Sequence, residues 1–392
     1  MHTAFFIIDY SITGGVERVN ANLSKLFFKN GIEASYIISL RSEKAKPGIE
    51  YPDHLDVFVL FPDGKVGDIS TTLSKFLLHH NISTLIFQGD NMTITLAVQK
   101  AARMANCRAM LHYHGSPYGY LKKYIYREDI LRKPINALKL LWSHVVYPFK
   151  KAKLKKVIVN AVDGFVCVSE GVRAEILNLF SLPDQIAKQV ISIPNPLTFN
   201  IAADNFFKKE NKIVYISRLH RKHKNSMMAL KVWKLLEKKY PQWQLYILGD
   251  GPIKNDMEDF CRHFQLQHVV FTGMVSNVQP YLQSSSISVL TSDCEGLGMG
   301  LLESACYKNA LLVTRADGGV TDIVEEGITG NLVPRNDVPD FANKLSVLMD
   351  DEALRKAMGN NAYKKLADFE DAKIAELWKK ILILKFEDLK MC

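Results

Sequence analysis

Long hydrophobic runs are missing from this sequence, and so are the cysteine patterns of small disulfide-stapled domains. No stretch of about 18 or more apolar residues occurs, so no membrane-spanning helix is expected. The first three residues carry no lysine or arginine and Asp9 interrupts the apolar run at 4–8, so no signal peptide is expected either. The six cysteines form no CxxC pair. These absences argue against a disulfide framework or a zinc site and favour a reducing cytoplasm.

Two catalytic patterns are also missing. No Asp-x-Asp motif follows a predicted strand, where it would hold Mg²⁺ against a diphosphate, so no metal site is expected. Cys294 stands beside Glu295 in a glycine-rich stretch and is a conceivable nucleophile. No histidine or carboxylate lies at a spacing typical of a cysteine nucleophile's partner, so the prediction gives Cys294 no catalytic role.

The positive charge is concentrated in one segment. Residues 118–160 hold eleven lysines and arginines but only two acidic residues, and so account for the whole net charge of +9. Aromatic residues are interleaved with these cations. Five apolar residues could line one face of a helix there: Leu138, Leu141, Trp142, Val145 and Val146.

A basic amphipathic helix flanked by aromatic residues suits an anionic membrane surface or a lipid-linked acceptor, which is the favoured interpretation of residues 118–160. A solvated helical insertion with a charged outer face is the main alternative. A nucleic-acid contact is the least favoured, so no nucleic-acid partner is expected.

The length of 392 residues is too great for one ordinary core and predicts two domains. Short apolar runs alternate with helical patterns, which is typical of doubly wound parallel sheets. The expected strands are 4–8, 34–40, 57–61, 84–88, 108–112, 190–193, 213–217, 244–248, 269–272, 287–290 and 310–313. The polar stretch 197–211 is a candidate linker between the two domains.

The stretch 291–314 combines a strand end, a glycine-rich turn and a helix start. Glycines occupy 296, 298 and 300, where they let a ligand approach the backbone. The helix start offers unpaired N–H groups. Glu295 precedes the turn and Glu303 lies eight residues further on, and carboxylates accept hydrogen bonds from hydroxyls. By spacing alone two solvated glutamates are the simpler interpretation, but the turn, helix and buried strand together favour a polyol site.

Three other strand ends carry candidate groups. Residues 14–19 (GGVERV) place Gly15 at a helix start, where an anion could bind. A tight turn that binds no ligand would have the same sequence pattern. Lysine and arginine are concentrated in residues 218–224, which suits an anion, with a surface basic loop as the alternative. Residues 112–117 (HYHGSP) bring His112 and His114 to a third strand end, where a histidine is more often structural than catalytic.

Together these segments resemble the retaining glycosyltransferases of family 4, which have the GT-B fold. Residues 295–303 resemble the nucleotide-sugar signature of that family, 218–224 its diphosphate loop and 272–275 the loop beside the base. The turn 249–252 and the first-domain segments 14–18, 112–115 and 169–173 resemble further motifs, and 330–334 resembles a final turn. The family often has glutamate where Asp322 stands, a small departure.

The resemblance covers residues 4 to about 370 and implies an α/β fold: GT-B, two Rossmann-like doubly wound domains with an interdomain cleft. It implies an N-terminal acceptor-side domain at 1–200 and a C-terminal nucleotide-sugar domain at 201–371. The last helix, in 372–392, would cross back to the N-terminal domain.

The resemblance also assigns residues to roles. Arg218 and Lys224 would hold the donor's diphosphate, with Lys222 as a near alternative. Glu303 would hold the ribose, and His114, with His112 as runner-up, would lie near the sugar and the acceptor. The donor-binding set is Gly15, Arg218, Lys224, Val275, Glu295, Gly296, Leu297, Gly298, Met299 and Glu303, and the catalytic set is His114, Arg218, Lys224 and Glu295. Cations would replace a metal, and no cofactor is implied beyond the nucleotide sugar as co-substrate.

The implied function is retaining transfer of a sugar from a nucleotide diphosphate sugar, with a UDP-sugar favoured, to a hydroxyl of a lipid-linked or cell-envelope glycan such as lipopolysaccharide or capsule. The expected location is the cytoplasm, peripheral on the inner face of the membrane. Two other classes stay open: a GT-B nucleotide-sugar epimerase or hydrolase, and a non-catalytic paralogue that binds the donor.

Overall fold

The computed structural model describes residues 2–11, 15–41, 51–89, 91–122, 130–131, 135–161, 163–197 and 208–383. Two compact units divide the chain. The first comprises residues Met1–Gly115, Val146–Pro196 and Phe369–Cys392, and the second Ser116–Val145 and Leu197–Asp368. The boundaries expected from the sequence gave residues 116–145 to the first domain, whereas their contacts group them with the second unit.

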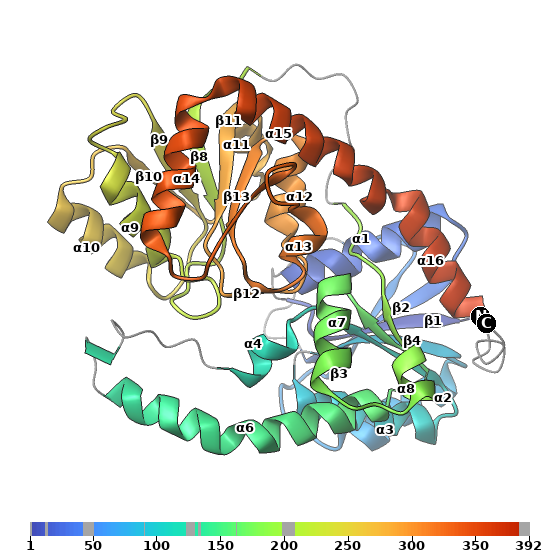
Figure 1. Cartoon of the computed structure of the whole chain (residues 1–392). Helices are drawn as coiled ribbons and strands as arrows, with labels where there is room; N and C mark the ends of the chain where they lie inside the picture. The colour runs from blue at the N-terminus through green and yellow to red at the C-terminus, as the bar shows by residue number, and fades with distance from the viewer. Residues whose placement is uncertain are drawn as a thin grey trace. The chain divides into compact units, whose positions relative to one another are not determined.

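The first unit is built on a seven-stranded parallel sheet in the order β3-β2-β1-β4-β5-β6-β7 (Figure 1). Its strands are β1 (Thr3–Asp9), β2 (Ala34–Arg41), β3 (Asp56–Phe61), β4 (Thr84–Gln88), β5 (Arg108–Tyr113), β6 (Phe165–Cys167) and β7 (Val190–Ser192). Its helices are α1 (Gly15–Lys29), α2 (Ile69–His79), α3 (Met92–Met104), α7 (Glu170–Leu179), α8 (Asp184–Gln189) and α16 (Asp371–Ile383). The long helix α6 (Ile135–Val159) contains the division between the units at residue 145.

Helices α1 and α16 share one hydrophobic core with the first sheet. Phe5 and Ile7 of β1, two residues apart and so on one face of the strand, belong to the same cluster as Phe27 and Trp378. The rings of Phe27 and Trp378 lie 5.6 Å apart, edge to face. Arg108 donates to the carbonyl oxygens of two residues at the end of α16, at 2.7 and 3.0 Å, where the helix dipole favours a cation.

The second unit is built on a six-stranded parallel sheet in the order β10-β9-β8-β11-β13-β15. Its strands are β8 (Glu210–Ile216), β9 (Gln244–Leu248), β10 (Val269–Gly273), β11 (Ser285–Leu290), β13 (Ala310–Thr314) and β15 (Gly330–Val333), with β12 (Cys294–Glu295) and β14 (Asp317–Gly318) as a separate pair. Its helices are α4 (Pro117–Leu121), α9 (Met227–Leu236), α10 (Lys254–Phe264), α11 (Gln279–Ser284), α12 (Met299–Cys306), α13 (Val320–Ile323), α14 (Val338–Asp350) and α15 (Glu352–Lys365), and a 3₁₀ turn covers Leu366–Phe369.

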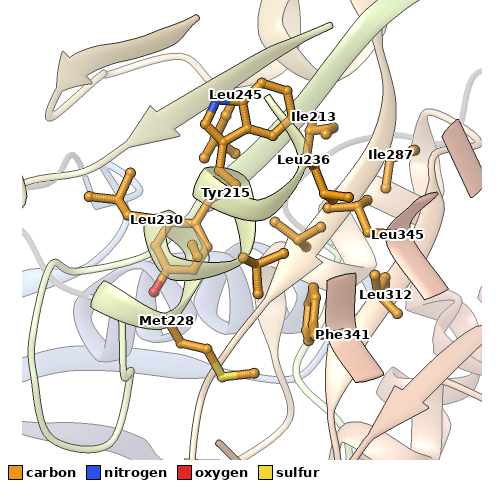
Figure 2. Packing of buried hydrophobic residues seen from close by; sticks show 14 of the residues in the cluster. Ile213, Tyr215, Met228, Leu230, Leu236, Leu245, Ile287, Leu312, Phe341 and Leu345 are labelled. Atoms are coloured by element: carbon orange, nitrogen blue, oxygen red, sulfur yellow. The ribbon is translucent and has the colours of Figure 1, made fainter. Parts of the chain in front are cut away.

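The core of the second unit follows the period of two in its strands. Ile213 and Tyr215 of β8 lie in one cluster with Leu230 of α9 and with Phe341 and Leu345 of α14 (Figure 2). Strands buried on both faces read as continuous apolar runs, which is why they could be predicted from the sequence.

One expected element is wrong. Residues 330–334 resemble a final turn, but 330–333 form β15, the edge strand of the second sheet. Leu332 and Val333 are buried and pair with Val313 and Thr314 of β13. The apolar part of this strand is too short for its sequence to indicate more than a turn.

Within the described ranges, no helix is both long enough and apolar enough to cross a membrane. Parallel strands bring all their carboxyl ends to one edge of each sheet. The loops after β1 and β5 in the first unit, and after β8, β9, β10 and β11 in the second, carry the residues selected from the sequence.

Candidate functional site

The glycine-rich turn joins β11 to α12 at the carboxyl edge of the second sheet. The chain leaves β11 at Leu290, forms the short strand β12 and enters α12 after Gly298. Gly298 is the N-cap, with a left-handed φ of 93°, and no side chain caps the helix. The first amide groups of α12 are therefore available to a ligand at this edge.

The backbone of Glu295 is held by the small β12–β14 sheet, which pairs Glu295 with Gly318. Gly318 has a φ of 102°, and a Cβ there would lie only 1.7 Å from the carbonyl oxygen of Glu295, so only glycine fits. Gly319 N donates to the same oxygen at 3.1 Å. The position of Glu295 is thus fixed by a segment more than 20 residues further along the chain.

The carboxylate of Glu295 receives two donors on one oxygen. Lys224 Nζ lies 2.6 Å from Oε1, and Ser292 Oγ donates to the same Oε1 at 2.5 Å. Burial by itself would lower the pKa of Lys224, but the charge and hydrogen bond of Glu295 outweigh it and raise that pKa, so the ammonium stays charged at neutral pH. No hydrogen bond to Oε2 is found in the described part of the chain, which leaves that oxygen to accept from a hydroxyl.

The loop that carries the cations is tied to both of its neighbours. Leu219 N donates to Asp250 O at 2.9 Å, which attaches its first half to the turn after β9. Asp293 N donates to His223 O at 2.6 Å, which attaches its second half to the glycine-rich stretch. These bonds hold the loop in place before any ligand arrives.

Arg218 and Lys222 differ from Lys224 in their surroundings. Both are exposed, and within the described ranges neither side chain forms an ion pair. Of these three cations Lys224 is the one that contacts a carboxylate, and Arg221 of the same loop pairs with Asp256 at 2.8 Å. Arg218, at the end of β8, keeps its guanidinium free for an anion.

Cys294 does have a histidine neighbour, which its position in the sequence did not indicate. His223 Nδ1 lies 3.0 Å from Cys294 Sγ. Burial, with the charge of Glu295 adding to it, raises the pKa of the Cys294 thiol to about 12. Burial, and then the nearby cations, lower the pKa of His223. The pair is therefore a neutral thiol and imidazole rather than a thiolate and imidazolium.

The remaining candidates for donor binding lie after β10, in the glycine-rich turn and in α12. Val275 follows β10 and is half-buried, and Glu303 is half-buried in α12. Leu297 is 3% exposed, so only its backbone could reach a ligand. Gly296 and Met299 are half-buried on either side of the turn.

The first unit holds the other two candidates, Gly15 and His114. Gly15 is the exposed first residue of α1, and nothing lies within 4 Å of where its Cβ would be. Its neighbour Gly14 lies outside the described residues. The role of Gly15 beside the diphosphate stays a prediction from the sequence.

His112 and His114 are adjacent and neutral. His112 is 1% exposed, with its ring 5.3 Å from Trp378 and 4.2 Å from His114. Burial lowers the pKa of both and takes that of His114 to about 3. Among the described residues nothing pairs with His114 Nε2. His114 is the less buried of the two and remains the candidate for contact with substrate.

Sequence reasoning missed Ser292 and His223. Ser292 is fully buried and fixes the carboxylate of Glu295, and the signal was its place three residues before that glutamate. His223 could not have been found, because its contact joins residues 71 apart. In the part of the chain that the structure describes, no three His, Cys, Asp or Glu side chains are grouped as a metal site would require.

Residues 198–365 match the family model of glycosyl transferases group 1. Over 389 residues the chain is 25% identical to an uncharacterized glycosyltransferase of Haemophilus influenzae, covering 96% of this chain and 99% of the relative. The crystal structure of Staphylococcus aureus TarM with fondaparinux, α-GlcNAc-glycerol and UDP aligns with a TM-score of 0.78 at 14% identity, over 98% of this chain and 100% of TarM. The protein is a glycosyltransferase with the GT-B fold, and its residues 198–365 are similar to glycosyl transferases group 1.

Another relative of this glycosyltransferase is an enzyme of Campylobacter jejuni. It is an α-1,4-N-acetyl-D-galactosaminyltransferase named for the acceptor GalNAc-α-(1→4)-GalNAc-α-(1→3)-diNAcBac-PP-undecaprenol. The two are 31% identical over 202 residues, which is 51% of this chain and 56% of the relative. The match thus spans about half of each protein.

Proposed function

We propose that this glycosyltransferase moves a sugar, with retention of its anomeric configuration, from a UDP-sugar to a hydroxyl of a lipid-linked or cell-envelope glycan. The observation that carries the proposal is the contact between Lys224 and Glu295 beside the uncapped start of α12. The undecaprenol-linked acceptor of the C. jejuni relative and the UDP bound to TarM support the choice of acceptor and donor.

The chemistry needs positive charge more than a covalent partner. When the glycosidic bond breaks, negative charge develops on the leaving UDP, and preorganised donors stabilise it. Arg218 and Lys224 supply that charge in the place of a metal ion, and the amide of Gly15 joins them. The leaving phosphate takes the proton of the acceptor hydroxyl, which attacks from the same face. No cofactor takes part.

The donor's sugar, ribose and base are assigned to residues at the carboxyl edge of the second sheet. Glu295 accepts from the transferred sugar through Oε2, with the amides of residues 296–299 beside it. Glu303 accepts from the ribose hydroxyls, and Val275 lies against the base. His114 of the first unit, neutral at physiological pH, is assigned to the sugar and the acceptor.

Product analysis separates this function from its alternatives. Purified protein is incubated with a UDP-sugar panel and a bacterial lipid extract, and products are followed by mass spectrometry. A lipid that gains one sugar residue supports transfer. A changed or hydrolysed donor sugar without lipid product would favour an epimerase or hydrolase, and donor binding without any product would favour a non-catalytic paralogue.

Membrane contact is the second part of the proposal, and it rests on α6. Leu138, Leu141, Trp142, Val145 and Phe149 recur at intervals of three and four residues, which places them on one face of the helix. Each is at least 55% exposed. Between residues 138 and 149 this face carries no charged side chain, whereas a solvated insertion would show charges there.

The lysines of α6 also favour contact with an anionic membrane. Six lysines accompany the apolar stripe: Lys139, Lys150, Lys151, Lys153, Lys155 and Lys156. An apolar stripe with adjacent cations is complementary to an anionic lipid surface, where the side chains enter the acyl boundary and the ammonium groups meet phosphates. We therefore place this protein at the inner face of the cytoplasmic membrane, where a lipid-linked acceptor would be found. Residues 123–129 and 132–134 of the basic segment lie outside the described residues.

A further inference from the structure

A second group of cations lies at the opposite edge of the second sheet, where its strands begin. A cavity of about 110 Å³ opens there, close to the first residues of β8, β11 and α15. One water needs roughly 10–15 Å³ on this measure, so the cavity has room for several waters or for one tetrahedral oxyanion. Arg218, Lys224 and Glu295 belong to the other edge and do not line it.

The cavity is strongly positive. Four cations line it, Lys209, Lys308, Arg355 and Lys356, together with one carboxylate, Glu352. Glu352 is already engaged, since its Oε1 lies 2.7 Å from Lys356 Nζ. The remaining positive charge has no counter-ion among the residues that line the cavity.

Two of these cations are held in place by backbone oxygens. Lys209 Nζ lies 2.6–3.2 Å from the carbonyl oxygens of Leu282, Ser285 and Tyr307 and 2.5 Å from Asn309 Oδ1. An ammonium has three N–H groups, so Lys209 is fully used. Burial, and then the charge of Lys308, lower the pKa of Lys209 to about 7, so it is partly charged at neutral pH.

Arg355 is fixed in a similar way but keeps donors. Its Nη1 donates to the carbonyl oxygens of Leu348 and Met349 at 2.6 and 2.9 Å, and its guanidinium lies 5.0 Å from the ring centroid of Trp243. Only Nη1 takes part in these bonds, so the guanidinium retains further N–H groups. A planar guanidinium held in one orientation matches two oxygens of a phosphate.

Lys308 and Asn211 add free donors. For Lys308 Nζ the one contact found in the described ranges is with the ring of Tyr363, at 5.0 Å. The exposed Asn211 amide has no hydrogen bond there. The cavity therefore combines fixed positive charge with donors that have no protein acceptor.

We propose that this cavity binds a phosphate group, as inorganic phosphate or as the phosphate of a monoester or lipid headgroup. Arg355 and Lys308 donate to the phosphate oxygens, Asn211 adds an amide, and Lys209 and Lys356 supply charge. This site is separate from the donor site and does not depend on which sugar the enzyme transfers.

The test is calorimetric titration of the full-length protein with sodium phosphate against sodium chloride of equal ionic strength. The test variant is Lys308→Asn with Lys356→Gln, because Lys308 has a left-handed φ of 54° that asparagine accepts. The matched control is Lys364→Gln on the exposed face of the same helix. Thermal melts and UDP release confirm that the variants fold and keep the donor site.

The wild type and Lys364→Gln should bind one phosphate saturably, and the double variant should lose about tenfold or more in affinity, as expected for charge-assisted hydrogen bonds. No saturable binding by the wild type, or equal affinity in the double variant, would overturn the proposal. Parallel titrations with glycerol phosphate and with phosphatidylglycerol vesicles identify the source, since a site for free phosphate binds both soluble ligands and a headgroup site prefers the vesicles.

Discussion

Lys224 Nζ lies 2.6 Å from Glu295 Oε1, which joins the loop after β8 to the turn after β11. The sequence had suggested separate partners for them, the diphosphate for Lys224 and the sugar for Glu295. Because the two side chains contact each other, each is held in position before a ligand binds. Arg218 and Lys222 are the exposed cations of this loop for which the described residues show no ion pair.

Removing either member should therefore cost stability as well as activity. Glu295→Ala and Lys224→Ala should each lower the free energy of unfolding by about 1–3 kcal/mol, since the first leaves the half-buried Lys224 and the second the buried Glu295 without its partner. The double variant should lose less than the sum, with a coupling of about 0.5–3 kcal/mol measured by urea unfolding. The exposed Arg262–Asp259 pair is the control, and Arg262→Ala should cost about 1 kcal/mol or less. Strict additivity of the two changes would contradict the role given to this contact.

Cys294 should be dispensable for chemistry. Its thiol pKa of about 12 keeps it protonated, even with His223 as a neighbour, so it is a poor nucleophile. We expect Cys294→Ser to keep kcat/KM within about threefold and the wild-type thiol to react slowly with iodoacetamide at pH 8, whereas loss of a covalent nucleophile costs far more. A drop of about a thousandfold on this change would restore the nucleophile hypothesis.

The paired histidines of the first unit should make the protein acid-sensitive. The pKa of His114 falls from its ordinary value of 6.5 to about 3 on burial, and that of His112 is also lowered. The unfolded chain then binds more protons than the folded one below about pH 6.5, so stability is lost as the pH falls through this window. One such histidine removes about 2 kcal/mol between pH 7 and pH 5. Urea unfolding at both pH values measures this, and His112→Leu with His114→Gln should flatten the difference; an unchanged difference would exclude these residues as its source.

The stripe on α6 should decide membrane binding. Trp142→Ser with Phe149→Ser should weaken flotation with phosphatidylglycerol vesicles by about a hundredfold, because each large side chain contributes roughly 1.5–3 kcal/mol when buried. Val347→Ser, which changes an exposed apolar residue of α14, is the control and should have no effect. Neutralising Lys150, Lys151, Lys153, Lys155 and Lys156 should reduce binding most at low salt. Unaltered flotation, or a dimer that the serine variants dissociate, would assign the stripe to another partner.

Much of the fold could be predicted because each buried strand of a parallel sheet appears in the sequence as a short apolar run. Apolar runs such as 34–40 and 84–88 became β2 and β4. The short pair β12 and β14 has no such signal, since two-residue strands are defined by a partner distant in the chain. The contact of His223 with Cys294 and the grouping of residues 116–145 with the second unit also depend on residues distant in the chain, so the sequence did not indicate them.

The candidate site also has features that the sequence could predict and contacts that it could not. Glycine turns and helix starts are local and could be found, which is why Gly298 and Glu295 were selected from the sequence. Which cation meets which carboxylate depends on how two loops approach each other. The sequence could therefore offer Lys224 and Lys222 as alternatives but could not show that Lys224 contacts Glu295.

UDP release from a panel of UDP-sugars, followed for the wild type and for Glu303→Ala without added metal, tests the central claim most directly. We expect release from one donor, and a loss of about 2–4 kcal/mol in transition-state stabilisation for Glu303→Ala, since a charged hydrogen-bond acceptor for the ribose is removed. Glu325→Ala, an exposed glutamate of the same unit, is the control and should match the wild type. UDP release that is unchanged in Glu303→Ala would contradict the ribose assignment. If no donor gives UDP release and no donor raises the melting temperature, the proposed glycosyl transfer is contradicted.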